Sequence, residues 1–239
     1  MTVRESLKLA VRTRLHRRGL SIGSDPYVNR LSRALAVRGT TTVLDVGANE
    51  GQYGALLRAA GYRGELISFE PLADAHARLS ARSARDLRWT SEQVAVGDEP
   101  GSATIHRAAN SYSSSLLPMS EAHLAADPTS RYDGDETVDV VTVDDVVTRR
   151  GIEPATTLLK IDTQGFESAV LDGATETLRT VDLVQLELSF VTLYDGQALH
   201  DELTARLRDV GLELHGLDPG IADPTTGRLL QVDALFARS

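Results

Sequence analysis

Three absences limit what this chain of 239 residues can be. It contains no cysteine, which excludes disulfide bonds, thiolate zinc sites and cysteine nucleophiles. No stretch approaches the roughly 18 apolar residues of a membrane span, and no signal-peptide pattern opens the sequence. The only lysines are Lys8 and Lys160, and neither has a tyrosine four residues upstream, so the Tyr-x-x-x-Lys pair of short-chain dehydrogenases is missing. The first two absences lead us to expect a cytoplasmic protein without a membrane span.

Basic residues are concentrated at the start of the chain, and acidic residues in the remainder. Residues 1–38 carry nine Lys or Arg against two acids, whereas the remainder carries 16 basic and 32 acidic residues. The basic start could be an arm that binds phosphate or nucleic acid, but we favour an amphipathic helix with solvated arginines. The acidic remainder argues against nucleic acid as a substrate. We expect a basic helical segment over residues 1–39 and one enzyme domain over residues 40–239.

A glycine-rich turn is the most informative motif of the sequence. Residues 45–54 read DVGANEGQYG, follow an apolar run and open a helix-like stretch. A strand that leads into a glycine turn and a helix N-terminus places a polar cofactor against exposed backbone N–H groups. About twenty residues later a second apolar run ends in Glu70, where sheets of this kind bind the hydroxyls of a ribose. The two features together predict a ligand that contains a nucleoside.

Two cofactors fit this pattern, and two residues separate them. The dinucleotide fingerprint G-x-G-x-x-G needs its second glycine so that a pyrophosphate can approach the backbone, and here that position is Asn49. Asp45 would repel phosphate but could hold an ammonium or sulfonium group. S-Adenosylmethionine carries both of these cations, so we favour it over NAD. A glycine turn without any ligand is the remaining alternative.

Strand-like and helix-like runs alternate along the chain. We expect strands at 41–46, 65–69, 93–96, 157–161, 183–188, 212–215 and 232–237, and helices at 53–60, 73–84, 166–179 and 199–210. Such alternation is typical of a doubly wound α/β fold, with a parallel sheet covered on both faces. A turn-like segment, not a helix, joins the last two strands, which predicts an antiparallel hairpin at the sheet edge.

The middle of the chain interrupts this alternation. Residues 98–156 hold no clear long helix, but they contain a short strand at 103–106, a polar run at 110–115 and an alternating strand at 137–143. Long irregular segments inside compact domains are usually functional or disordered. We expect this insert to lie over the carboxyl ends of the strands and to line a pocket; a flexible serine-rich loop is the alternative.

Several motifs occur in a recognisable order. In chain order, between residues 45 and 238, they are DVGANEGQYG, ISFEP, AVGDEPGSATIH, SYSSSL, VTVDDV, LLKIDTQGFESAVLDGA, VQLELS and QVDALFAR. Together they resemble the FkbM family of S-adenosylmethionine-dependent O-methyltransferases. The resemblance implies a class I methyltransferase sheet of seven strands in the order 3-2-1-4-5-7-6, the last antiparallel, with the insert after strand 3. It also implies methyl transfer to a hydroxyl, often on a sugar.

The resemblance also assigns the cofactor to particular residues. The backbone of residues 47–51, together with Asp45, would hold the methionine part, and Glu70 would take the ribose hydroxyls. Asp98 would accept from the adenine amino group, unless it is only a turn residue. The serines at 113–115 would hydrogen-bond cofactor or substrate. The predicted cofactor residues are Asp45, Gly47, Asn49, Gly51, Tyr53, Glu70, Asp98 and Ser115.

Methyl transfer to a hydroxyl needs a general base or a metal ion that acidifies the hydroxyl. Asp162 directly follows an apolar strand, at the edge of the sheet where catalytic residues of α/β folds gather. Glu187 lies within the next apolar strand, where an acid is costly unless it is paired or used. These two carboxylates could act on the hydroxyl or hold Mg²⁺. Buried acids without a chemical role are the alternative.

Further polar side chains are candidates for the reacting end of the site. A histidine could replace the carboxylates as base, and His123, His200 and His215 are available. We predict that Gln164, Tyr194 and His200 contact the substrate.

The sequence therefore predicts an O-methyltransferase that moves a methyl group from S-adenosylmethionine to a saccharide. A cell-envelope or polysaccharide precursor, such as a mannoside or another hexose, is the acceptor we favour. A polyketide or another natural-product hydroxyl is the nearest alternative. An NAD-dependent oxidoreductase and a non-catalytic cofactor-binding module are alternatives of other classes. The basic start and the insert are candidate surfaces for a homodimer.

Overall fold

The computed structural model describes residues 26–110, 112–223 and 225–239. The prediction of a basic helical segment falls largely on residues 1–25, which lie outside the described residues. Helix α2 (Pro26–Val37) begins the described part. Its buried side chains Tyr27, Leu31 and Leu35 recur at helical spacing and belong to the core on one face of the sheet, whereas Arg30 is exposed.

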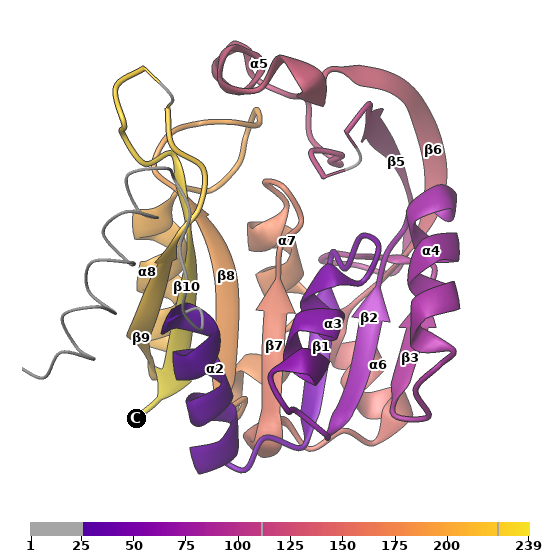
Figure 1. Cartoon of the computed structure of the whole chain (residues 1–239), viewed down its shortest axis with the longest axis vertical. Coiled ribbons are helices and arrows are strands. Elements are labelled where there is room, and N and C mark those ends of the chain that lie inside the picture. Colours follow the sequence, from indigo (N-terminus) through magenta and orange to yellow (C-terminus); the bar gives the residue numbers. More distant parts are fainter. Residues whose placement is uncertain (1–25, 111, 224) are drawn as a thin grey trace, which may run out of the picture.

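A seven-stranded sheet forms the central layer (Figure 1). Its spatial order is β3-β2-β1-β7-β8-β10-β9, and β10 is antiparallel to both of its neighbours while the other pairs are parallel. This order is equivalent to 3-2-1-4-5-7-6, which confirms the predicted fold. The strands are β1 (Thr42–Val46), β2 (Glu65–Phe69), β3 (Trp89–Glu92), β7 (Thr157–Ile161), β8 (Leu183–Ser189), β9 (Leu212–Pro219) and β10 (Gln231–Arg238).

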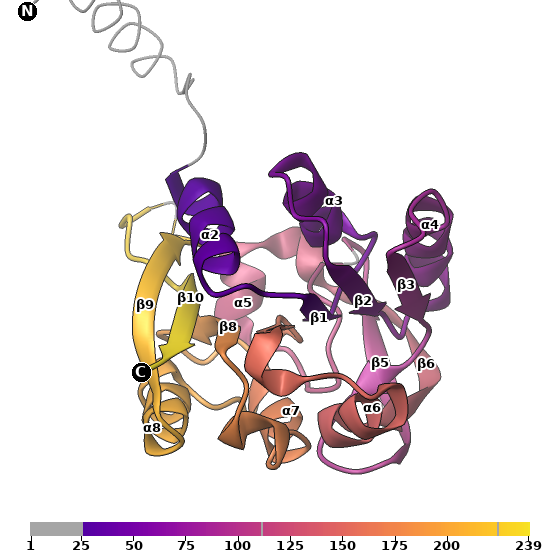
Figure 2. The ribbon, with the colours of Figure 1, turned by 90° about the horizontal axis from the view of Figure 1, so that it is seen from below.

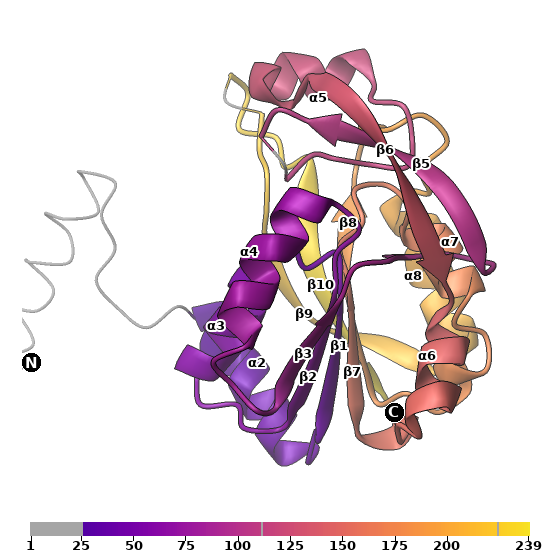
Figure 3. The ribbon, with the colours of Figure 1, turned by 90° about the vertical axis from the view of Figure 1, so that its right-hand side faces the viewer.

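Helices cover both faces of this sheet (Figures 2 and 3). Helices α2, α3 and α4 lie on one face, and α6, α7 and α8 on the other. Each layer closes over its own apolar cluster, so the sheet has a core on either side. No helix in the described part of the chain is long and apolar enough to cross a membrane. The remaining bounds are α3 (Gln52–Ala59), α4 (Ala73–Ser83), α6 (Val143–Arg150), α7 (Glu167–Asp172) and α8 (His200–Asp209).

The third strand of the sheet begins four residues before its predicted position. We expected it at 93–96, but β3 is Trp89–Glu92, and β4 (Ala95–Val96) pairs instead with β6 (Tyr132–Val141) of a second sheet. The buried indole of Trp89 explains the shift, because its Nε1 donates to Ser68 Oγ of β2 at 3.1 Å. The apolar run that suggested the strand therefore pairs with a strand of the insert and not with the seven-stranded sheet.

Two helix predictions also need correction. The helix expected at 166–179 ends at Asp172, because Gly173 packs so closely on the Gly97 carbonyl that a Cβ would lie 2.0 Å from its oxygen. A single 3-10 turn, η3 (Thr177–Arg179), follows it. The insert contains the unpredicted eight-residue helix α6, in which Thr142 caps the N-terminus by accepting from the Asp145 N–H at 3.1 Å.

The insert builds a small three-stranded sheet in the order β4-β6-β5. Figures 1 and 3 show it, with helix α5, beyond the ends of β1, β2 and β7 toward which these strands run. The prediction that the insert lies over the carboxyl ends of the strands is therefore confirmed. Its elements are β5 (Gly101–Ala108), α5 (Glu121–Ala126), η1 (Pro128–Ser130) and β6 (Tyr132–Val141), and η2 (Pro154–Thr156) leads back into β7.

A row of four buried polar residues crosses the apolar sheet. Ser68, Asp45, Lys160 and Gln185 are register partners on β2, β1, β7 and β8, so their side chains share one face. Ser68 Oγ donates to Asp45 Oδ2 at 3.0 Å, and Lys160 Nζ lies 3.2 Å from Asp45 Oδ1. Tyr53 Oη of α3 donates to Gln185 Oε1 at 2.7 Å. We call these four residues the polar row.

Lys160 is the cation at the centre of the polar row. Burial alone would lower the pKa of its ammonium, but the carboxylates of Asp45 and Asp162 outweigh burial and raise it. Its Nζ also donates to the Gly47 carbonyl at 3.1 Å. The ammonium thus joins β1, the glycine turn and the end of β7.

Replacing Lys160 with methionine should destabilise the protein by about 3–5 kcal/mol, because Asp45 would keep a buried charge without its cation. The urea-unfolding midpoint measures this loss. The matched control is Arg179→Ala, which breaks an exposed ion pair with Glu176 and should cost about 0–1 kcal/mol. Adding Asp45→Leu to Lys160→Met should recover part of the loss. Equal midpoints for Lys160→Met and Arg179→Ala would contradict this role.

Candidate active site

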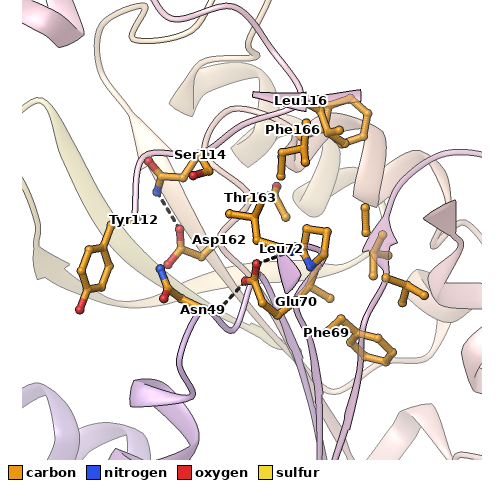
Figure 4. Close-up of a pocket in the computed structure, with 18 residues that line it drawn as sticks. Asn49, Phe69, Glu70, Leu72, Tyr112, Ser114, Leu116, Asp162, Thr163 and Phe166 are labelled. Atoms are coloured by element: carbon orange, nitrogen blue, oxygen red, sulfur yellow. Dashed lines mark hydrogen bonds between the residues drawn. The ribbon is translucent and has the colours of Figure 1, made fainter. Parts of the chain in front are cut away.

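A pocket opens between the carboxyl ends of the strands and the insert. In Figure 4, Asn49, Glu70 and Asp162 converge on its polar side. Much of the remaining lining is an apolar wall, made by Phe69, Leu72, Val94, Ile105, Leu116 and Phe166. In Figure 4, Phe69, Leu116 and Phe166 lie on the side away from Asn49 and Asp162. A pocket divided in this way suits a ligand with one charged part and one flat apolar part.

The glycine turn after β1 forms the floor of the pocket. Gly47 has a φ of +73°, and a Cβ added there would lie 1.8 Å from the Asp162 carbonyl oxygen, so only glycine fits. The N–H groups of Gly47 and Ala48 donate to the Phe69 carbonyl at 3.1 and 3.0 Å. The turn is therefore fixed against the ends of both neighbouring strands.

Glu70, at the end of β2, is held by backbone donors. Its Oε2 accepts from the Asn49 N–H at 2.8 Å and its Oε1 from the Leu72 N–H at 2.9 Å. Burial raises the pKa of its carboxyl to about 7, although these two N–H groups oppose the shift. Each oxygen keeps a lone pair, so an ionised Glu70 can accept from two further donors.

Asp162 is the first residue after β7, and its side chain is 35% exposed toward the pocket. Its N–H donates to the Val46 carbonyl at 3.1 Å, which ties it to β1. Oδ1 accepts from Gln164 Nε2 at 2.9 Å, and Oδ2 lies 3.5 Å from Lys160 Nζ. An accessible carboxylate with a fixed geometry can accept a proton from a hydroxyl placed beside it.

Glu187, on β8, lies behind Gln164. Its Oε2 accepts from Gln164 Nε2 at 2.9 Å and from Gln231 Nε2 at 2.8 Å. Burial first, and then the charge of Asp162, raise the pKa of Glu187 well above its usual value. The structure therefore brings the two predicted catalytic carboxylates together, but only Asp162 is among the residues that line the pocket.

Several predicted ligand contacts have other partners in the structure. Asp45 is fully buried beneath the turn beside Lys160, which corrects the prediction that its carboxylate faces a cofactor cation. Tyr53 faces the polar row, and burial raises its pKa well above the usual value. Ser115 is buried and donates to the Gln164 carbonyl at 2.6 Å. Asp98 is exposed in a turn and is not among the residues that line the pocket.

The aromatic and histidine candidates also lie away from the pocket surface. Tyr194 is completely buried and donates its Oη proton to Gln164 Oε1 at 2.8 Å, so it is an internal support and not a substrate contact. His123 packs edge-on against Tyr194, and burial lowers its pKa. His200 contacts the Phe190 ring, and His215 lies on β9 beside α2.

Lys160 and Glu167 are structurally central, but the sequence reasoning did not select them. Glu167 is buried, and its Oε1 accepts from the Thr163 and Gly165 N–H groups at 2.9 and 3.2 Å, so it shapes the loop that follows Asp162. A signal for Lys160 was present, because a lysine inside an apolar strand is as costly as the Glu187 carboxylate.

The donor set does not fit the predicted Mg²⁺. The two amide protons of Gln164 already occupy Asp162 and Glu187, and the Lys160 ammonium would repel a cation at Asp162. Among the residues that the structure describes, no group of three or more His, Cys, Asp or Glu side chains could hold a metal ion.

The strand order, the glycine turn and the carboxylate at the end of β2 define a class I methyltransferase. A family model described as "Methyltransferase FkbM domain" matches residues 45–214. The chain therefore belongs to the FkbM methyltransferase family, and it is an S-adenosylmethionine-dependent methyltransferase.

Two curated relatives and one solved structure are similar to this chain. It is 28% identical to the 2-O-methyltransferase NoeI of Sinorhizobium fredii, over 71% of this chain and 72% of that protein. It is 27% identical to the hexuronic acid methyltransferase AglP of Haloferax volcanii, over 60% of this chain and 54% of that protein. A crystal structure of a methyltransferase FkbM from Methylobacillus flagellatus matches the fold with a TM-score of 0.51 at 15% identity. That match covers 82% of this chain and 43% of the other.

The raised pKa of Glu70 leads us to expect pH-dependent cofactor binding. Ribose hydroxyls would donate to the ionised carboxylate, so binding favours ionisation, and affinity should rise as the pH rises through about 7. Calorimetric titration with S-adenosylhomocysteine between pH 5.5 and 8.5, on the order of 1.5 units either side of that pKa, measures the effect. Glu70→Gln should weaken binding by about 1–3 kcal/mol and abolish the dependence. A Glu70→Gln protein with wild-type affinity would exclude the ribose role.

The occupied carboxylates predict that Mg²⁺ has no specific site here. Millimolar MgCl₂ should leave the melting temperature unchanged, because only a ligand that binds the folded state stabilises it. Turnover should survive excess EDTA. Stabilisation by MgCl₂ that is lost in Asp162→Asn would show instead that a metal displaces Gln164.

Proposed function

We propose that this methyltransferase methylates a hydroxyl group of a saccharide. Two relatives support this proposal, because one is named a 2-O-methyltransferase and the other a hexuronic acid methyltransferase. The matched region spans about half of the second relative, so its substrate is a guide to chemical class only. The proposal includes a cytoplasmic location, as the sequence predicts.

The observation that carries the chemistry is the accessible carboxylate of Asp162. It lines the pocket at the end of β7, beside the glycine turn, and Lys160 and Gln164 fix its orientation. A sugar hydroxyl is a weak nucleophile while it holds its proton. Asp162 is the group placed to accept that proton as the new carbon–oxygen bond forms.

The residues that line the pocket fit S-adenosylmethionine. When bound, it supplies an electrophilic methyl group on a sulfonium, whose bonding electrons return to sulfur on transfer. We propose that the backbone of the turn at Gly47 and Asn49 holds its methionine part and that Glu70 holds its ribose. The apolar wall at Val94 and Phe166 suits the adenine.

The mouth of the pocket offers a surface for a sugar ring. Tyr112, in the insert, is 62% exposed and lines the pocket, and its Oη accepts from Gln52 Nε2 of α3 at 3.1 Å. Figure 4 shows its ring set apart from the residues around Glu70. An exposed aromatic face beside polar groups can pack against the C–H face of a pyranose while the sugar hydroxyls find donors and acceptors.

Mass spectrometry of candidate acceptors incubated with the enzyme and labelled S-adenosylmethionine tests the proposal. We expect one added methyl on a hexoside or uronic acid and none on polyketide alcohols. Asp162→Asn should lower kcat about 10²–10⁴-fold while S-adenosylhomocysteine still binds. The control is Asp209→Asn at the exposed end of α8, which should keep wild-type turnover. Methylation confined to polyketide alcohols would refute the saccharide proposal, and wild-type turnover by Asp162→Asn would refute its role as base.

A further inference from the structure

The side chain of Gln164 bridges the two carboxylates of the site. One amide group donates to Asp162 Oδ1 and to Glu187 Oε2, both at 2.9 Å. An amide nitrogen has two protons, so both are used. A neutral double donor is the kind of group that can hold two acids together without adding charge.

The orientation of this amide is fixed from the other side. Tyr194 Oη donates to Gln164 Oε1 at 2.8 Å, so the nitrogen must face the carboxylates. Tyr194 is completely buried and cannot turn toward solvent. The backbone of Gln164 has a φ of +54°, a conformation that non-glycine residues adopt only under constraint, and its carbonyl accepts from Ser115 Oγ at 2.6 Å.

Ser115 and Tyr194 belong to two segments that cover the site, residues 113–120 of the insert and 190–197 after β8. We call these two segments the roof. Backbone hydrogen bonds join them, from the Ser120 N–H to the Leu193 carbonyl at 2.9 Å and from the Asp195 N–H to the Pro118 carbonyl at 2.8 Å. Gln164 is thus attached to both halves of the roof and to both carboxylates.

We propose that Gln164 is a positioning residue through which the roof sets the geometry of Asp162 and Glu187. This inference rests on the proposed role of Asp162 as base, and it replaces the prediction that Gln164 and Tyr194 bind the substrate. Without the bridge, Asp162 and Glu187 would lose their shared donor, and their side chains would be free to rotate apart. Misplacement of a reacting group by about 1 Å can lower a rate on the order of 10²-fold.

The first test replaces Gln164 with methionine, which keeps the length of the side chain but neither donor. We expect kcat to fall on the order of 10²-fold, with the acceptor KM and the affinity for S-adenosylhomocysteine unchanged. A residue that contacts the substrate would instead raise the acceptor KM and leave kcat intact, and that result would overturn the proposal. The acceptor is whichever hydroxyl compound the wild-type enzyme methylates, so failure of the saccharide proposal does not enter the comparison.

A double-mutant cycle tests the connection to the roof. Tyr194→Phe removes the hydroxyl that orients the amide, together with its longer contact to the Ser113 carbonyl at 3.2 Å, and it should lower kcat in the same way as Gln164→Met but less. In the Gln164→Met background the same change should have no further effect, because residues that act through one contact are not additive. Tyr62→Phe is the matched control and should leave kcat unchanged. It removes a hydroxyl that donates to the Glu65 carbonyl at 3.2 Å, at the start of β2 and away from the carboxyl ends of the strands.

Thermal melting shows whether Gln164→Met folds poorly. In that case Tyr194→Phe and Ser115→Ala test the inference without it, since each loosens Gln164 from one half of the roof. Lower kcat at unchanged KM in both supports the positioning role. Additive losses in the cycle, or wild-type kcat in both roof variants, would overturn it.

Discussion

The interaction on which the site depends is the buried contact between Lys160 and its two carboxylates. The ammonium lies 3.2 Å from Asp45 and 3.5 Å from Asp162, and it also binds the Gly47 carbonyl. An ion buried in a sheet is costly unless every group around it is satisfied. Here one ammonium contacts the Asp45 carboxylate of β1, the Gly47 carbonyl of the glycine turn and the carboxylate of Asp162, the proposed base. The floor of the pocket and the base therefore cannot move independently.

The pocket divides the work between the two halves of the sheet. Strands β1 and β2 lead into the glycine turn and the Glu70 carboxylate, which two backbone N–H groups hold in place and whose remaining lone pairs suit recognition of a ligand. Strands β7 and β8 contribute Asp162 and Glu187, which suit the chemistry. The insert adds Ile105 and Leu116 to the apolar wall and forms one of the two halves of the roof. In a parallel sheet all of these groups meet at one edge because the strands end there together.

The sequence alone predicted the parts of the structure that follow from a regular apolar pattern or from a known motif. The glycine turn, Glu70 and Asp162 each follow an apolar run, and Glu187 stands out as an acid within one. The strand order follows from the resemblance to the FkbM family. The sequence was insufficient where contacts between distant residues decide the structure. The position of β3 depends on Trp89 reaching Ser68, and the end of α7 depends on Gly173 meeting Gly97. Neither contact leaves a local pattern.

The same distinction explains why several predicted site residues have a different role in the structure. Asp45, Tyr53, Ser115 and Tyr194 are polar residues near the motifs, and sequence position alone could not tell the pocket surface from the layer beneath it. Burial decides between them, and all four face inward to support other residues. The one exposed aromatic side chain at the mouth, Tyr112, had been predicted only as part of a polar run.

The location of the only tryptophan has a practical consequence. The indole of Trp89 is buried, its ring packs against the glycine turn at Gly51 and Gly54, and its nitrogen is bonded to the polar row through Ser68. Any movement of the turn changes the surroundings of that ring. The intrinsic emission of the protein is therefore a built-in optical reporter of how tightly the floor of the pocket is held, without a dye or label.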